Sequence, residues 1–323
     1  MANGPTVTFP NGRTMPTVGM GLWKVSKETV AEHVYQAVKQ GYRLFDNATD
    51  YANEVEVGQG LRRAMDEGLV EREELFIVGK LWNTFHAREH VKENFLRTAG
   101  DLGVDYLDMY LVHFPVALKY VPQEVRYPPE WHYEPGGEVI PVKVPFRETW
   151  EAMEALYEEG LAKNIGISNM SGAMLYDLLS YAKVRPALLQ VELHPYLHRK
   201  QLVQLAQAEG LHVTAYSSMG DTGYHEINKV PGSPSFVPLL RHDVIAEIAK
   251  KHKRSSAQVL LRWAIERGLC VIPKASNTRE MAENLLVFDF SLDEADMKTI
   301  AGLNENMIFN DPGEGFGRLI WAC

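Results

Sequence analysis

Short apolar runs alternate with helix-like segments along this chain, and that alternation limits the folds open to it. Eight runs have the composition of buried strands: TVGMGLW, LFDNA, LFIVGKLW, YLDMYLVHF, KNIGISN, LLQVELHP, HVTAYSSM and CVIPKAS. Neighbouring parallel strands need a crossover connection, usually a helix, and such strands are buried on both faces. Eight strand–helix units in strict alternation therefore favour an α/β fold, a parallel (β/α)8 TIM barrel, over an open sheet.

The length of 323 residues allows two average domains, but an eight-unit barrel also fills it. No internal repeat or linker is visible, so we predict one domain over residues 1–323. The opening TVTF-PNG-RTMP predicts a small β-hairpin with a Pro-Asn-Gly turn. Ser26 is the predicted N-cap of the first helix, and a short helix is expected near Thr278. Ser291 and Glu294 predict a capping box for one further helix.

Two connections are unusually long, roughly residues 116–144 with YPPEWHYEPGG and roughly 220–237 with DTGYHEINKVPGSPS. Long insertions without regular structure at the C-terminal face of a barrel are usually binding loops or lids. The tail over residues 304–323 has no strong periodicity, and we expect it to lie over the barrel mouth.

Charge and composition exclude several classes of protein. A formal net charge of −9 argues against non-specific nucleic-acid binding, since a phosphate backbone is held by clustered Lys and Arg. The N-terminus resembles no signal peptide, and no apolar run reaches the roughly 18 residues of a membrane span. Cys270 and Cys323 can pair on paper, but two isolated thiols in a long chain are typical of cytosolic proteins. We expect a soluble cytoplasmic protein.

Four polar residues occupy matching places in successive strand–helix units. Asp46 and Tyr51 lie in LFDNATDY, Lys80 in LFIVGKLW and His113 in MYLVHFP. Asp46 and Lys80 are 34 residues apart, and Lys80 and His113 are 33 apart. Barrel enzymes carry their chemistry at the C-terminal ends of such strands. The spacing therefore predicts an active site.

These residue types suit proton donation to a carbonyl oxygen. A tyrosine titrates near pH 10 in water, which is high for a proton donor at neutral pH. An ammonium group about 4 Å away contributes about 4 kcal/mol at an effective dielectric of 20, so Lys80 is expected to lower the pKa of Tyr51 before burial opposes it. Asp46 would hold Lys80 in place and protonated, and His113 would orient the carbonyl. The matching step is hydride delivery to the carbonyl carbon.

The same stretches resemble the aldo-keto reductase family, and the similarity runs nearly end to end. The matching segments are FDNATDYANEVEVG, GKLWN, DYLDMYLVHFP, KNIGISN, LLQVELHPY, TAYSS and VIPKASN. Within the family the chain is most similar to the xylose (aldose) reductases of yeasts and fungi, through YPPEWHY, TAYSSMG and MIFNDP. The resemblance implies a barrel that binds an extended nicotinamide cofactor, with Tyr51 as acid/base, Lys80 and Asp46 as its tuners and His113 as the orienting group.

The resemblance also implies a cofactor site. Ser168, Asn169 and Gln190 match residues that bond the nicotinamide carboxamide, and Tyr216 matches the ring that stacks on it. Ser217 would meet the pyrophosphate and Glu226 the adenosine ribose. The adenosine end would involve Lys274, Ser276, Asn277, Glu280, Glu283 and Asn284.

The sequence departs from the family at the 2′-phosphate position. Lys274 is present, as expected for NADPH, but Glu280 stands where the family usually has Arg, and Arg279 comes one place earlier. A carboxylate there would repel a phosphate and can accept a ribose hydroxyl. We therefore expect NADPH with a weakened preference, or dual use of NADPH and NADH.

Trp23, Asp50, Phe114 and Asn310 match the substrate pocket of the xylose reductases. The resemblance thus implies reduction of open-chain aldoses to alditols, a reaction of carbohydrate metabolism, by a monomer or homodimer. Reduction of aldose phosphates, with Lys119 and Arg126 as candidate contacts, or of general aldehydes is the alternative.

Two other classes remain open: a non-catalytic family member, and a barrel glycosidase that uses Asp46 and Glu192. The segment His86–His90 fits H-x-x-E-H, a zinc-peptidase pattern, but it opens a charged helix, so we expect no metal. Gly19-Met-Gly21 and Gly58-Gln-Gly60 begin like dinucleotide fingerprints and lack the third glycine.

Overall fold

Eight parallel strands form the centre of the molecule, in the order of the sequence. The computed structural model describes residues 4–220, 224 and 236–313. The strands are β3 (Met20–Gly21), β4 (Leu44–Asp46), β5 (Phe76–Leu81), β6 (Met109–Val112), β7 (Ile165–Ser168), β8 (Leu188–Glu192), β9 (His212–Tyr216) and β10 (Cys270–Val271). Each neighbour pair from β3 to β10 is parallel. All eight predicted runs contain one of these strands.

The first and last strands meet and close the sheet. Val18 and Val271 form a parallel bridge, and the Gly19 N–H donates to the Val271 carbonyl at 2.9 Å. The Gly21 N–H donates to the Pro273 carbonyl at 3.1 Å. A Cβ on Gly21 would lie 2.4 Å from the Ile272 carbonyl oxygen, so only glycine permits this approach. The predicted closed barrel is confirmed.

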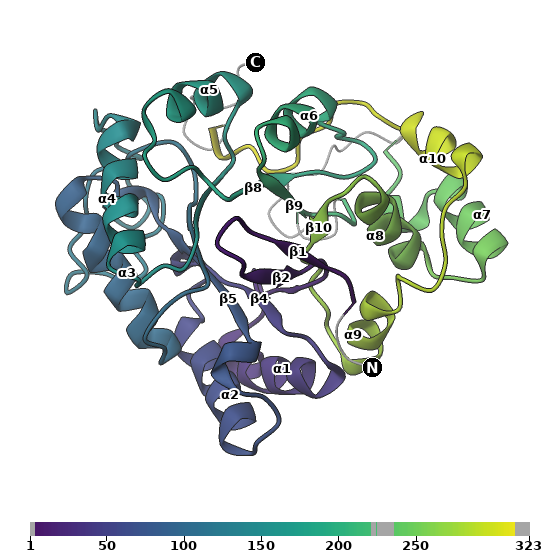
Figure 1. Cartoon of the computed structure of the whole chain (residues 1–323), viewed down its shortest axis with the longest axis horizontal. Helices are drawn as coiled ribbons and strands as arrows, with labels where there is room; N and C mark the ends of the chain where they lie inside the picture. The colour runs from purple at the N-terminus through teal and green to yellow at the C-terminus, as the bar shows by residue number, and fades with distance from the viewer. Residues whose placement is uncertain (1–3, 221–223, 225–235, 314–323) are drawn as a thin grey trace.

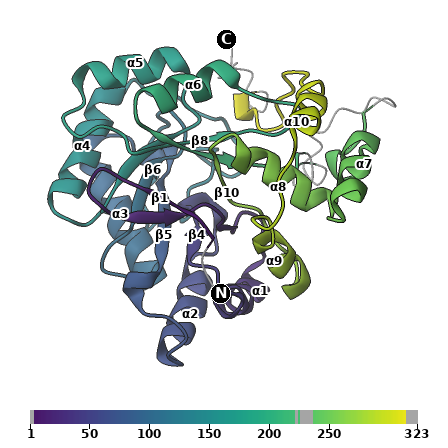
Figure 2. The same cartoon turned by 45° about the vertical axis from the view of Figure 1, so that its right-hand side comes forward.

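Helices surround the strands, as Figures 1 and 2 show from two sides. They are α1 (Lys27–Gln40), α2 (Glu54–Asp66), α3 (Arg88–Leu102), α4 (Phe146–Glu158), α5 (Gly172–Tyr181), α6 (Lys200–Ala208), α7 (Asp243–His252), α8 (Ser256–Glu266), α9 (Thr278–Leu285) and α10 (Glu294–Ala301). Single 3-10 turns lie at η1 (Thr49–Tyr51), η2 (Arg72–Glu74), η3 (Asn83–Phe85) and η6 (Leu239–Arg241). None of the described helices has the length and apolarity needed to cross a bilayer.

The predicted N-terminal hairpin closes one end of the barrel. β1 (Thr6–Thr8) pairs antiparallel with β2 (Thr14–Pro16), and the hairpin lies across the front of the barrel in Figure 1. Phe9 and Met15 are buried in one cluster with residues from inside the barrel, among them Leu44 and Leu111. The larger apolar cluster lies between strands and helices. The opposite end is therefore the open one.

The capping box of the last helix differs from the prediction. The N-cap of α10 is Asp293, whose side chain accepts the Asp296 N–H, and Asp296 accepts the Asp293 N–H in return. Ser291 and Glu294 satisfy the same pattern two residues earlier. The observed pattern is favoured by contacts from α7, because Lys251 pairs with Asp293 at 2.6 Å and with Asp296 at 2.8 Å, and His252 Nε2 lies 2.7 Å from Asp296 Oδ2. At the first helix, Ser26 is the N-cap residue, but its side chain accepts no helix N–H.

The long segments lie partly within the described residues. The first loop folds back on itself, because the Lys119 N–H donates to the Ile140 carbonyl at 2.8 Å. Of the second loop, Gly220, Tyr224, Phe236 and Val237 are described. The tail is described as far as Gly313, and its residues Asn310 and Pro312 lie at the barrel mouth.

Candidate active site

Four predicted catalytic side chains converge at the open end of the barrel. Asp46 ends β4, Tyr51 ends η1, Lys80 lies near the end of β5, and His113 follows β6. The C-terminal ends of successive parallel strands share one rim, so residues far apart in sequence become neighbours there.

Lys80 connects three oxygen atoms beneath this rim. Its Nζ lies 2.5 Å from Asp46 Oδ1 and donates to Tyr51 Oη and to the Asn47 carbonyl, both at 2.9 Å. The side chain is fully buried. A buried ammonium is costly unless it is paired, and here each of its three protons has an acceptor. The position of the Tyr51 hydroxyl is therefore well defined.

The electrostatic expectation for Tyr51 is wrong. Burial raises its pKa well above the ordinary value, and the carboxylates of Asp46 and Asp50 raise it further. The ammonium of Lys80 does not act alone on the phenol, because Asp46 offsets its charge and burial opposes any phenolate. Burial also lowers the pKa of Lys80, which Asp46 opposes. The phenol is thus protonated at neutral pH, as a proton donor must be.

His113 is neutral in this setting. Burial lowers its pKa well below the ordinary value, and Lys80 lowers it further. Its ring lies edge-on to that of Tyr51, with 6.0 Å between centroids. A neutral imidazole keeps one N–H donor and one acceptor nitrogen. It can therefore bond an uncharged oxygen next to the phenol.

The rim opens into a cavity of about 730 Å³. The predicted residues that line it are Trp23, Asp46, Asp50, Tyr51, His113, Phe114, Ser168, Asn169, Gln190, Tyr216, Ser217, Lys274, Ser276, Glu280, Glu283, Asn284 and Asn310. Lys80 lies behind Tyr51, and Asn277 caps α9 instead of facing the cavity. Glu226 is outside the described residues. The cavity has the size of a cofactor or substrate site.

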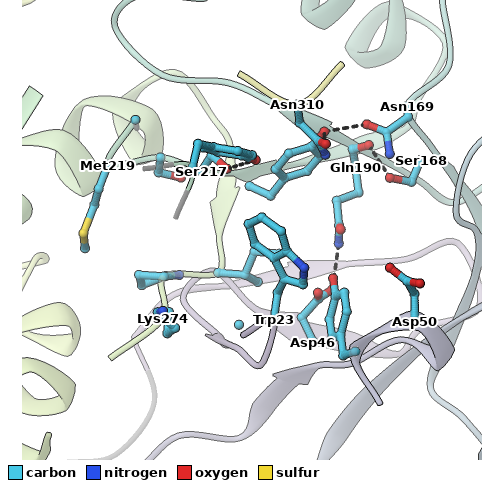
Figure 3. Close-up of a pocket in the computed structure, with 18 of the residues that line it drawn as sticks. Trp23, Asp46, Asp50, Ser168, Asn169, Gln190, Ser217, Met219, Lys274 and Asn310 are labelled. Atoms are coloured by element: carbon cyan, nitrogen blue, oxygen red, sulfur yellow. Dashed lines mark hydrogen bonds between the residues drawn. The ribbon is translucent and has the colours of Figure 1, made fainter. Parts of the chain in front are cut away.

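One wall of the cavity consists of hydrogen-bonded amides and hydroxyls. Gln190 Nε2 donates to Asp46 Oδ2 at 2.7 Å, and Ser168 Oγ donates to the Gln190 carbonyl at 2.9 Å. Asn169 Nδ2 donates to the His113 carbonyl at 2.9 Å, and its Oδ1 accepts from the Tyr216 hydroxyl at 2.7 Å. Figure 3 shows the Gln190 side chain extending from Ser168 and Asn169 to Asp46.

The backbone is strained where this wall meets the strands. Asn169 has φ 57° and Ser217 has φ 54°, in the left-handed region that L-residues rarely adopt. Such conformations persist only where surrounding bonds hold them, and they concentrate at functional sites. The two Asn169 hydrogen bonds and the one between Ser217 Oγ and Tyr224 Oη, at 2.8 Å, supply that support.

The far end of the cavity carries Glu280. Its Oε2 accepts the Ser276 N–H at 2.7 Å, and its Oε1 accepts from Asn277 Nδ2 at 2.9 Å. Asn277 Oδ1 accepts the Glu280 N–H in return, at 3.0 Å, which caps α9. The carboxylate is therefore fixed on the loop that follows β10, beside the exposed Lys274. The nearby Arg279 is exposed and pairs with Glu283 at 3.4 Å.

Apolar and acidic groups flank the catalytic end. Trp23 lies against Tyr224, with ring centroids 5.4 Å apart. Burial and the neighbouring Glu130 raise the pKa of Asp50 to about 7. Phe114 and Asn310 complete this part of the wall.

Sequence reasoning missed several lining residues, of which Trp131, His132 and Tyr224 are aromatic. Trp131 packs edge-on against Trp82 at 4.7 Å and Phe114 at 5.1 Å. The signal was an aromatic pair in a Pro-rich loop at the C-terminal face, YPPEWHY. No local pattern marks Tyr224, which lies in the second long loop.

Glu192 is not part of the cavity wall. It is fully buried, and its two carboxylate oxygens accept backbone N–H groups of Phe309 and Asn310. A glycosidase needs two carboxylates that flank the sugar. The pairing of Asp46 with Glu192 for that purpose is therefore wrong.

Within the described part of the chain, no three His, Cys, Asp or Glu side chains are grouped as a metal site requires.

Comparison with known proteins agrees with this geometry. The family model described as the aldo/keto reductase family matches residues 15–305. The chain is 50% identical to the NAD(P)H-dependent D-xylose reductase of Pyricularia oryzae, over 97% of this chain and 96% of that protein. It is 52% identical to a probable NAD(P)H-dependent D-xylose reductase of Emericella nidulans, over 95% and 96%.

Solved structures give the same result. The aldose reductase of Schistosoma japonicum has a TM-score of 0.86 at 35% identity and covers 98% of this chain and 97% of its own. The aldo-keto reductase of Bombyx mori, in complex with NADP, has a TM-score of 0.87 at 33% identity and covers 100% of both chains. The chain therefore belongs to the aldo/keto reductase family.

Proposed function

We propose that this enzyme reduces the open-chain aldehyde of aldoses, of which D-xylose is one, to the alditol with NAD(P)H. The observation that carries the proposal is the Tyr51 hydroxyl in the cavity wall, bonded to a buried ammonium that Asp46 holds. The hydroxyl can donate its proton, and the ammonium then stabilises the phenolate that remains. The fungal relatives described above are named NAD(P)H-dependent D-xylose reductases, which supports the choice of substrate.

The residues of the amide wall fit a nicotinamide cofactor. A carboxamide has two N–H donors and one carbonyl acceptor. Beyond their mutual bonds, Ser168 Oγ and Gln190 Oε1 can accept, and Asn169 Nδ2 has a second proton to donate. Tyr216 offers a ring beside them, and Lys274 offers a cation at the far end. The three polar side chains thus match the carboxamide, the Tyr216 ring matches the nicotinamide face, and Lys274 matches a phosphate.

The proton transfer follows from the geometry around Tyr51. When bound, the reduced nicotinamide supplies the hydride that adds to the carbonyl carbon. The carbonyl oxygen takes the proton of the Tyr51 hydroxyl, so the aldehyde becomes an alcohol. Lys80 stabilises the phenolate, because it already donates to Tyr51 Oη at 2.9 Å. His113 donates a hydrogen bond to the same oxygen and orients it.

An unphosphorylated sugar fits the catalytic end better than a sugar phosphate. Asp50 and Asn310 can bond hydroxyls, and a carboxylate beside a phosphate is unfavourable. Lys119, considered as a phosphate contact, instead lies over the Tyr133 ring with Nζ 3.8 Å from its centroid. Arg126 donates to loop carbonyls, including that of His132. Among the described lining residues, Lys274 is the sole Lys or Arg.

The test measures oxidation of NADPH and NADH by absorbance with D-xylose, other aldoses, an aldose phosphate and an apolar aldehyde. Tyr51→Phe removes the proton donor, so turnover should fall by at least about 10²-fold while the cofactor still binds. If turnover of Tyr51→Phe stayed within a few-fold, the acid would be another group. Tight cofactor binding without oxidation by any aldehyde would favour a non-catalytic family member.

We further propose a cytoplasmic enzyme, active as a monomer or homodimer, in which a single barrel domain carries both cofactor and substrate. The buried, unpaired thiol of Cys270 agrees with a reducing compartment. The excess of acidic residues opposes nucleic-acid binding. Light scattering at several concentrations would measure the oligomeric state.

A further inference from the structure

A buried carboxylate outside the cavity holds the C-terminal segment in place. Glu192, the last residue of β8, is fully buried. Its Oε1 accepts the Phe309 N–H at 2.8 Å, and its Oε2 accepts the Asn310 N–H at 3.0 Å. His194 Nε2 lies 2.9 Å from the same Oε1. Both oxygens of the carboxylate are thus engaged by the protein itself.

The tail is held near this contact by the buried Phe309 ring, which packs against His194, Tyr224 and Phe236, and by backbone hydrogen bonds. α10 ends at Ala301, and residues 304–310 form neither helix nor strand. The Tyr196 carbonyl accepts the N–H groups of Glu305 and Met307 at 3.2 and 3.0 Å. Beyond Met307, the backbone hydrogen bonds of Phe309 and Asn310 go to Glu192. The carboxylate, together with the packed Phe309 ring, therefore sets where the tail meets the barrel mouth.

From Asn310 a series of hydrogen bonds runs into the cavity, where Figure 3 shows the side chains. Asn310 Nδ2 donates to Tyr216 Oη at 3.0 Å, and the Tyr216 hydroxyl donates to Asn169 Oδ1 at 2.7 Å. Asn169 Nδ2 donates to the carbonyl of His113 at 2.9 Å. A displacement of the tail would thus move the Asn310 amide first and the Tyr216 hydroxyl next.

We propose that Glu192 is a positioning residue for the reduction: by accepting two successive N–H groups of the tail, it places the Asn310 amide for the sugar hydroxyls. The inference rests on the proposed function. It also explains the residue type, because only a carboxylate can accept with both of its oxygens. Glutamine has the same shape but offers one acceptor oxygen, and its NH₂ would face a backbone N–H. The segment around Asn310 would then shift.

The test compares Glu192→Gln with wild type on D-xylose or another aldose that wild type reduces. We expect the KM for the sugar to rise about tenfold, corresponding to about 1.4 kcal/mol, with a change in kcat of less than about threefold. If Glu192 acts through Asn310, the effects must not add. In an Asn310→Ala background, Glu192→Gln should change KM by less than about twofold.

Glu154 provides a matched control. It is buried on α4, and its Oε1 accepts the N–H groups of Lys183 and Val184 at 2.7 and 2.9 Å. None of these three residues lines the cavity. Glu154→Gln keeps the accepting oxygen and should therefore leave the sugar KM unchanged. Glu154→Ala loses both hydrogen bonds, so it should lower the melting temperature and again leave the sugar KM unchanged.

Three outcomes would overturn the inference: equal sugar KM values for the two Gln variants, a fall in kcat alone, or additive effects with Asn310→Ala. If Glu192→Gln does not fold, Glu192→Asp enters the same cycle, where its shorter carboxylate should raise KM less and again without additivity. A wild-type enzyme that reduces no aldehyde would refute the proposed function instead, so the two failures are distinguishable.

Discussion

Replacing Glu280 by Gln tests how the enzyme distinguishes NADPH from NADH. The carboxylate lies in the cavity wall and already accepts the Ser276 N–H at 2.7 Å, a donor that a 2′-phosphate would otherwise use. Gln keeps the shape and one acceptor oxygen for the Ser276 N–H, the exposed bond from Asn277 Nδ2 passes to water, and the cap from Asn277 Oδ1 to the Glu280 backbone N–H is untouched. The substitution therefore removes mainly a negative charge.

The size of the effect follows from the charges. A phosphate monoester carries about 1.5 to 2 negative charges near neutral pH. At about 5 Å in a water-like dielectric it repels a carboxylate by on the order of 1 to 2 kcal/mol. Glu280 is only partly buried, so we use the water-like value and not the larger value of an interior site. Removing the charge should thus tighten NADPH binding by about tenfold and leave NADH binding within about twofold.

The assay is the ratio of kcat/KM for NADPH to that for NADH, measured at low and high salt. Glu280→Gln should raise the ratio by about tenfold, and salt should shrink the difference between variant and wild type because it screens exposed charges. Glu247→Gln is the control, since it removes one exposed charge on α7 away from the cavity. A ratio unchanged by Glu280→Gln at low salt would refute the reasoning, as would a wild type that favours NADPH by several hundredfold.

Two further predictions concern stability and the sugar site. Burial raises the pKa of Glu54 to about 7 from 4.5, so the folded protein holds that proton more tightly than the unfolded chain. Its contribution is fully present below pH 4.5 and is lost, by on the order of 3 kcal/mol, as the pH rises from there to about 7. Thermal melting of Glu54→Gln across this range should show a weaker decline in stability than wild type. An equal decline in wild type and Glu54→Gln would contradict the raised pKa of Glu54. Trp131→Ala removes a side chain of the cavity wall that packs on Trp82 and Phe114. KM for a bulky aldehyde should therefore rise by about tenfold, and kcat should change by less than about threefold. An unchanged KM would exclude Trp131 from the substrate-binding wall.

The barrel was predictable because buried parallel strands are apolar on both faces and leave a period that local sequence reveals. The convergence of Asp46, Lys80 and His113 followed from the same regularity, since equal steps along the chain lead to one rim. Both features depend on the repeated strand–helix unit, and this repeat is visible in a single sequence.

What escaped prediction depends on contacts between distant segments. Ser291 and Asp293 open equally good capping patterns, and the pattern observed is favoured by Lys251 and His252, about 40 residues away, which contact Asp293 and Asp296. The pKa of Tyr51 depends on burial and on the carboxylates of Asp46 and Asp50 together, and its pair with Lys80 alone does not represent these effects. Glu192 looked like a candidate acid because its partners, Phe309 and Asn310, are more than 100 residues further along.

The closure of the barrel through Gly21 has a consequence for how the enzyme gains activity during synthesis and folding. Asp46 and Gln190 are bonded across 144 residues, and the Val18–Val271 bridge joins the two ends of the sheet. Contacts this far apart in sequence form late, because loop closure must precede them. When only the N-terminal half of the chain has folded, Asp46, Tyr51, Lys80 and His113 are present, but Gln190 and its hydrogen bond to Asp46 are missing. During refolding, recovery of turnover therefore measures closure of the complete barrel, whereas helix content measures only the formation of individual helices.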